Sequence, residues 1–176
     1  MEEYAGFLTG ELIKQGSFDR YNLAGYSSGG TIALEMARQL GDKVGQVFFI
    51  DTPNYKIYPE MLNFSMILKN TFTAVRYYSI KDIFAYMRRY FGEVKQKKNM
   101  IAEWRKLIAM IRAYEPDANG MPVFLITSSE ITARTDSKLG WQLLIPGDMA
   151  AHFDSGHISI MQKKAPEIAR IIDSAM

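Results

Sequence analysis

The pentapeptide Gly25-Tyr26-Ser27-Ser28-Gly29 is the part of the sequence that points most directly to chemistry. It has the form G-x-S-x-G, in which a serine on a tight strand-to-helix turn exposes its hydroxyl as a nucleophile. Only Ser27 fits this frame, because Ser28 has Tyr26 two residues before it. The pattern predicts a nucleophilic serine, and the alternative is a glycine-rich turn without chemistry.

The glycines of this turn have a steric explanation. Side chains at positions 25 and 29 are expected to collide with neighbouring backbone, and Gly30 lets the following helix begin close against a sheet. The N-terminus of that helix favours negative charge that develops next to Ser27.

A serine hydroxyl is a weak nucleophile until a base accepts its proton, and a histidine is the usual base. The sequence holds two histidines. His157 lies in the small-residue stretch 154–158, which predicts a loop from which the ring can reach the carboxyl edge of a sheet. His152 falls inside a predicted strand, where a structural role is expected. We therefore expect His157 to be the base.

Three acidic residues are candidates for the group that orients the imidazole. Asp51 ends the strand that follows the helix after Ser27, so it should reach the same sheet edge. Glu130 and Asp136 follow a later predicted strand. We favour Asp51 and keep the other two as alternatives.

The elements that must position these residues alternate between strands and helices. A strand, a helix and a second strand around Ser27 imply a right-handed parallel crossover, and the apolar run 44–50 suits a sheet covered on both faces. The predicted fold class is therefore α/β with a mostly parallel sheet. The expected helices are 1–15, 29–40 and a closing helix containing Ile168, Ile171 and Ile172; the expected strands are 20–24, 44–50, 123–127 and 150–153.

Residues 56–113 differ from the rest of the chain. They are helix-prone and carry 12 Lys or Arg against four acidic residues, a net charge of +8, whereas the remainder carries −6. We interpret this segment as a basic helical insertion on a slightly acidic body. A solvated helix surface without a partner is the alternative.

Composition limits the function classes. The 176 residues suit one domain, and 21 basic against 19 acidic residues leave a charge of only +2, which argues against nucleic-acid binding. No apolar run is long enough to span a membrane, and the acidic start is not a signal peptide. Zero cysteines and two histidines argue against disulfides and metal sites. We expect a cytoplasmic protein.

Several motifs together resemble the thioesterase domains of nonribosomal peptide synthetases and polyketide synthases. These domains have the α/β-hydrolase fold, and the order Ser27, Asp51, His157 is the hydrolase order. The resemblance covers almost all of residues 1–176. The similar stretches are 21–37, 47–51, 113–116, 121–126, 139–141, Gly147 and 156–158.

The resemblance implies a function and a partner. Ser27 would be the nucleophile, Asp51 the acid and His157 the base, and 56–113 would form a lid over an acyl channel. The substrate would be an acyl or peptidyl chain on the phosphopantetheine of a carrier protein, released by hydrolysis or cyclisation without a bound cofactor. A general esterase or lipase is the alternative enzyme.

One departure from the family concerns the N-terminus. In the family several strands precede the serine turn, and an early loop supplies one oxyanion-hole amide. Here the turn begins at residue 25, so we expect a truncated domain with the Ser28 amide as its remaining donor. Losing one donor costs about 10²- to 10³-fold in rate. A weak fragment that acts as a binding module, or that covers its exposed sheet edge as a homodimer, is the non-catalytic alternative.

Overall fold

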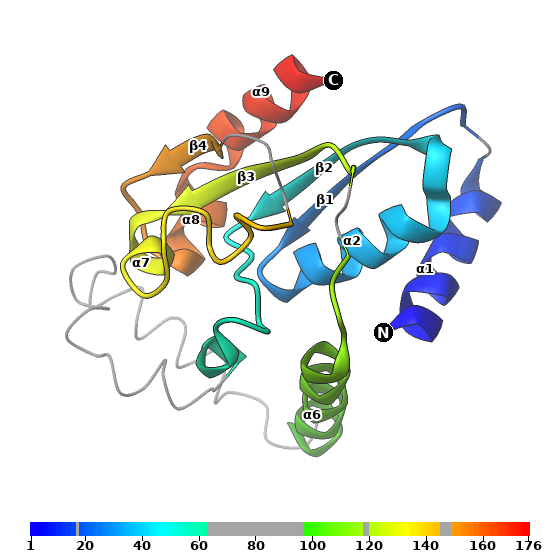
Figure 1. Ribbon diagram of the computed structural model, residues 1–176, viewed down its shortest axis with the longest axis horizontal. Coiled ribbons are helices and arrows are strands. Elements are labelled where there is room, and N and C mark those ends of the chain that lie inside the picture. The colour runs from blue at the N-terminus through cyan, green and yellow to red at the C-terminus, as the bar shows by residue number, and fades with distance from the viewer. Residues whose placement is uncertain (17, 63–96, 118–119, 145–148) are drawn as a thin grey trace.

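The computed structural model describes residues 1–16, 18–62, 97–117, 120–144 and 149–176 (Figure 1). Helices and strands alternate along most of this chain. Its helices are α1 (Glu2–Gln15), α2 (Ser28–Leu40), α6 (Lys97–Ala113), α7 (Ser129–Thr132), α8 (His157–Lys163) and α9 (Ala165–Ala175), with short 3-10 turns at Gly41–Lys43 and Pro59–Leu62. Its strands are β1 (Tyr21–Tyr26), β2 (Val44–Ile50), β3 (Val123–Ser128) and β4 (Met149–Phe153).

The four strands form one parallel sheet in the order β1-β2-β3-β4. Because the strands are parallel, their carboxyl ends all lie at one edge of the sheet. The segments that follow β1, β2 and β3 begin at this edge. Within the part of the chain that the structure describes, β1 pairs only with β2.

Helices cover both faces of the sheet, and β2 shows why. Val47 and Phe49 pack toward α2, whereas Phe48 and Ile50 pack toward α8 and α9. Successive side chains of a strand point to opposite faces, so a strand buried on both sides must be apolar throughout. Figure 1 shows α1 beside α2 on one face and α9 on the other. The predicted α/β class with a parallel sheet is confirmed.

Most predicted elements occur with small changes at their ends. The first strand continues through Tyr26, and the end of the chain forms two helices rather than one. Pro166 lies in the first turn of α9, where its missing N–H is tolerated, so a new helix begins there. Of the predicted insertion 56–113, residues 63–96 lie outside the described residues. Among the residues that the structure describes, no helix is long and apolar enough to cross a membrane.

A buried glutamate joins α2 to the segment that follows α6. Glu35 is fully buried and accepts hydrogen bonds from Arg38 (2.7 and 2.8 Å), Gln39 (2.8 Å) and the Tyr114 hydroxyl (2.9 Å). Burial alone would raise the pKa of Glu35, but the hydrogen bonds from these three residues outweigh it and lower the pKa below its ordinary value. The carboxylate therefore stabilises the fold in its charged form.

We expect Glu35→Gln to lower the free energy of unfolding by about 1.5 to 3 kcal/mol at pH 7, because an amide places N–H groups against existing donors. The folded-state pKa of Glu35 lies below the ordinary value of 4.5. The stability that the charged carboxylate contributes is therefore fully present above about pH 4.5 and is lost as the pH falls through the folded-state pKa. Urea unfolding at pH 7 and at about pH 3 measures this difference. Glu103→Gln, in an exposed pair with Lys106, is the control and should change stability by less than about 0.5 kcal/mol. A Glu35→Gln effect that is equal at both pH values would contradict this account.

Candidate active site

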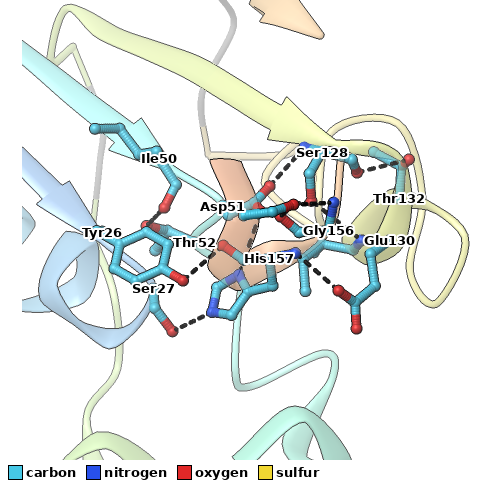
Figure 2. Close-up of polar contacts among 12 residues, drawn as sticks. Tyr26, Ser27, Ile50, Asp51, Thr52, Ser128, Glu130, Thr132, Gly156 and His157 are labelled. Carbon is cyan, nitrogen blue, oxygen red and sulfur yellow. Dashed lines mark hydrogen bonds and ion pairs between the residues drawn. The ribbon is translucent and has the colours of Figure 1, made fainter. Parts of the chain in front are cut away.

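Ser27 lies on the turn between β1 and α2 and has a left-handed backbone, with φ of 54°. Its amide donates to the Ile50 carbonyl at the end of β2 (2.9 Å), and its carbonyl accepts from Gly30 (3.1 Å). A positive φ at a non-glycine residue is costly and persists only where neighbouring structure enforces it. Figure 2 shows the side chain at this turn, directed toward His157.

The glycines around Ser27 have unequal steric roles. A Cβ at Gly25 would lie 2.4 Å from the backbone of Gly29 and Gly30, and a Cβ at Gly30 would lie 2.2 Å from the Thr52 hydroxyl oxygen. A Cβ at Gly29 would meet no atom within 4 Å. The expected collision is therefore present at position 25, and the prediction for position 29 is wrong: Gly29 is crowded at its backbone, not at its Cβ.

His157 lies between Ser27 and Asp51. Its Nε2 is 3.1 Å from Ser27 Oγ, and its Nδ1 is 3.2 Å from Asp51 Oδ2. The loop predicted at 154–158 is partly wrong, because His157 is the first residue of α8. Ser159 Oγ accepts from the Gly156 amide (2.9 Å) and donates to the Gly156 carbonyl (3.1 Å), which fixes the start of this helix.

Asp51 is fully buried directly after β2 and has a φ of 47°. Its carboxylate accepts hydrogen bonds from the Ser128 amide (2.6 Å) and the Ser128 hydroxyl (2.5 Å). Because the carboxylate is the acceptor, His157 Nδ1 must be the donor, and Nε2 of the neutral ring is left to accept from Ser27. The arrangement can therefore pass the serine proton to the ring and stabilise the resulting imidazolium.

Two further residues hold the backbone of His157. Glu130 accepts a hydrogen bond from its amide (2.8 Å), and the Tyr26 hydroxyl donates to its carbonyl (2.7 Å). The Tyr26 ring also stacks on the imidazole, with 4.7 Å between ring centroids. Figure 2 shows this enclosure of His157. Glu130, one alternative acid, thus contacts the histidine backbone instead of the ring.

The other alternative residues lie in separate networks. Asp136 accepts from the Tyr58 hydroxyl (2.7 Å) and from the backbone of Lys138 (2.8 Å) and Gly140 (3.1 Å). His152 lies in β4, where its Nδ1 is 2.9 Å from Thr127 Oγ1 and its Nε2 is 3.1 Å from Ser129 Oγ.

Sequence reasoning missed Ser128 and Tyr55. Ser128 ends β3, next to the end of β2, so its place after a predicted parallel strand was the available signal. Tyr55 has no such signal, yet its hydroxyl lies 3.4 Å from Ser27 Oγ. Ser28, the expected oxyanion donor, is the first residue of α2, where the amide has no intrahelical acceptor.

No group of three or more His, Cys, Asp or Glu able to hold a metal occurs within the described ranges.

Comparisons with known proteins place the chain in a family. The thioesterase domain family model matches residues 1–176. Among solved structures, the NocB thioesterase domain from the nocardicin cluster aligns with a TM-score of 0.69 at 21% identity, covering 98% of this chain and 73% of that chain. No curated protein sequence matches the chain.

Two other solved structures show the same fold. A four-domain nonribosomal peptide synthetase, AB3403, aligns with a TM-score of 0.64 at 18% identity, covering 99% of this chain and 15% of that chain. A lipase-esterase related protein from Clostridium acetobutylicum aligns with a TM-score of 0.59 at 17% identity, covering 98% and 72%. The fold is of the α/β-hydrolase type.

The glycines yield a direct test of the turn. We expect Gly25→Ala and Gly30→Ala to lower the free energy of unfolding by about 1 to 3 kcal/mol, because each new methyl group overlaps existing atoms. Gly29→Ala is the matched control and should be neutral or stabilising by up to about 1 kcal/mol, since alanine favours helix. Urea unfolding of the three variants measures the differences. Equal destabilisation by all three would show that the turn is not packed as described.

Proposed function

The chain belongs to the thioesterase domain family, and from this premise we propose that it is a serine thioesterase. In this proposal it releases an acyl or peptidyl chain from the phosphopantetheine arm of a carrier protein. The observation that carries the proposal is the continuous contact from Ser27 Oγ through the two ring nitrogens of His157 to Asp51, at 3.1 and 3.2 Å.

The proposed reaction begins with transfer of the Ser27 hydroxyl proton to His157 Nε2 while Oγ forms a bond to the thioester carbonyl carbon. Asp51 stabilises the charged imidazole, and the Ser28 amide at the start of α2 donates to the developing oxyanion. The carbon–sulfur bond then breaks, and the thiol leaves with the proton from Nε2. Water, or an amine or hydroxyl of the bound chain, then attacks the acyl carbon and gives its proton to His157 Nε2. The bond from the acyl carbon to Ser27 Oγ breaks, and Oγ takes the proton from Nε2, which completes hydrolysis or cyclisation.

The carrier-protein partner is supported by two observations. One similar structure is a four-domain nonribosomal peptide synthetase, and this similarity supports a substrate bound to a carrier protein. The sequence of 56–113 also has a net charge of +8, which would attract an acidic carrier. The polyketide synthase link, a lid over an acyl channel, a cytoplasmic location and a homodimer stay predictions from sequence.

A general esterase is the second candidate, favoured by the similarity to a lipase-esterase related protein. The same three side chains would serve an oxygen ester. Comparing kcat/KM for matched thioester and oxygen-ester substrates separates the two functions, because only a thioesterase should prefer the thioester.

Covalent labelling tests the assignment of the three residues. We expect a fluorophosphonate to form one adduct on Ser27, detected by intact mass and peptide mapping, and none on Ser27→Ala. His157→Gln should abolish labelling, and Asp51→Asn should slow turnover by about 10⁴-fold, because the ring tautomer is lost. His152→Gln is the control and should label at the wild-type rate. Folded wild-type protein without an adduct would contradict the proposal.

Ionic strength tests the carrier partner. We expect kcat/KM toward a carrier-bound thioester to fall at least about tenfold between roughly 20 and 500 mM NaCl, because salt screens long-range attraction. The same acyl group on a small uncharged thiol should change by less than about twofold. Equal salt dependence for both substrates would mean that the basic segment does not steer a carrier.

A further inference from the structure

Tyr55 places a hydroxyl group beside the nucleophile. Its oxygen lies 3.4 Å from Ser27 Oγ, and Tyr55 itself is buried. In the contact described above, Ser27 donates its only proton to His157, so its oxygen can accept but not donate toward Tyr55. The donor in the Tyr55 contact is therefore the phenol.

The loop that carries Tyr55 is fixed at its start. The Trp141 ring donates to the Thr52 carbonyl (2.7 Å), and the Asn54 amide donates to the Leu139 carbonyl (2.8 Å). The Asn54 side chain donates to the Gly140 carbonyl (3.1 Å). Neighbouring backbone thus determines the position from which the Tyr55 side chain leaves the chain.

The Tyr55 ring is held as well. It packs in a buried cluster with Leu62, Ile108 and Ile111, which come from the 3-10 turn and from α6. A hydroxyl on a rigid, buried ring loses little freedom when charge develops next to it, which is what a preorganised donor requires. Burial also raises the pKa of Tyr55 to about 12, so the phenol keeps its proton at neutral pH.

We propose that Tyr55 is a catalytic hydrogen-bond donor to Ser27 Oγ, in addition to the three residues of the proposed function, on which this inference rests. As the Ser27 proton moves to His157 Nε2, negative charge grows on Oγ and the Tyr55 hydroxyl stabilises it. The phenol keeps its own proton throughout. When the acyl-enzyme breaks down, the bond from Oγ to the acyl carbon cleaves, and Tyr55 stabilises the same atom until His157 returns the proton.

The alternative is that the Tyr55 ring only fills the buried cluster and that its hydroxyl contact to Ser27 has no effect on catalysis. The two interpretations predict different reaction rates for a variant without the Tyr55 hydroxyl, because a side chain that only fills the cluster contributes to stability alone. Removing one hydrogen-bond donor to a charged reacting oxygen typically costs about 10²- to 10³-fold in rate, and a smaller effect is expected here because the contact is long at 3.4 Å.

The test compares Tyr55→Phe with wild type by the rate constant of fluorophosphonate labelling and by thiol release in single turnover of a small thioester. We expect both the labelling and the acylation rates to fall about 10- to 100-fold, deacylation to slow as well, and KM to stay within about twofold. Tyr114→Phe is the control: it removes another buried tyrosine hydroxyl, bonded to Glu35, and should keep wild-type rates.

Tyr55→Phe at wild-type rates, with wild-type protein active, would overturn the inference and leave the proposed function standing. Wild-type protein that is folded but not labelled on Ser27 would overturn both. If Tyr55→Phe unfolds, a fluorotyrosine placed at position 55 keeps the ring and the hydroxyl but ionises at lower pH. The alkaline loss of labelling should then move to lower pH than in wild type, and an unchanged profile would overturn the inference.

Discussion

The rest of the site depends on the hydrogen bonds that the buried carboxylate of Asp51 accepts. A carboxylate removed from water is costly unless hydrogen bonds satisfy it, and here Ser128 and His157 do so from β3 and α8. The backbone closes the same arrangement, because Ser27 donates to the end of β2 and Asp51 donates to the Ile126 carbonyl of β3 (2.8 Å). Three consecutive parallel strands therefore end in one hydrogen-bonded unit, and Ser27 belongs to it.

Backbone strain within this unit is offset by burial around it. Ser27 and Asp51 both have positive φ, and packing of the apolar layers on each side of β2 compensates for the energy that this conformation costs. His157 carries no such strain, but its amide, carbonyl and ring each have a partner in Glu130, Tyr26 and Asp51. The imidazole is thus oriented before any substrate arrives, which lowers the reorganisation needed during reaction.

The sequence predicted Ser27, Asp51 and His157 because each lies in a recognisable local pattern, although their contacts span 130 and 106 residues. It missed the partners that no local pattern marks. The turn at Ser27 was predictable because its glycines are adjacent, and Asp51 because it ends an apolar strand. The bond from Ser128 to Asp51 spans 77 residues and the contact from Tyr55 to Ser27 spans 28, so no local pattern contains either. The error at Gly29 has the same origin, since the space around a Cβ depends on what packs against it.

The cluster of Tyr55, Leu62, Ile108 and Ile111 has a consequence for how relatives of this domain can diverge. It packs the 3-10 turn that holds Leu62 against α6, so two elements that are far apart in the sequence are held together by buried side chains. The entropic cost of lengthening a closed loop grows only with the logarithm of its length. A change in the length of chain between these two elements is therefore inexpensive, and it need not move Ser27.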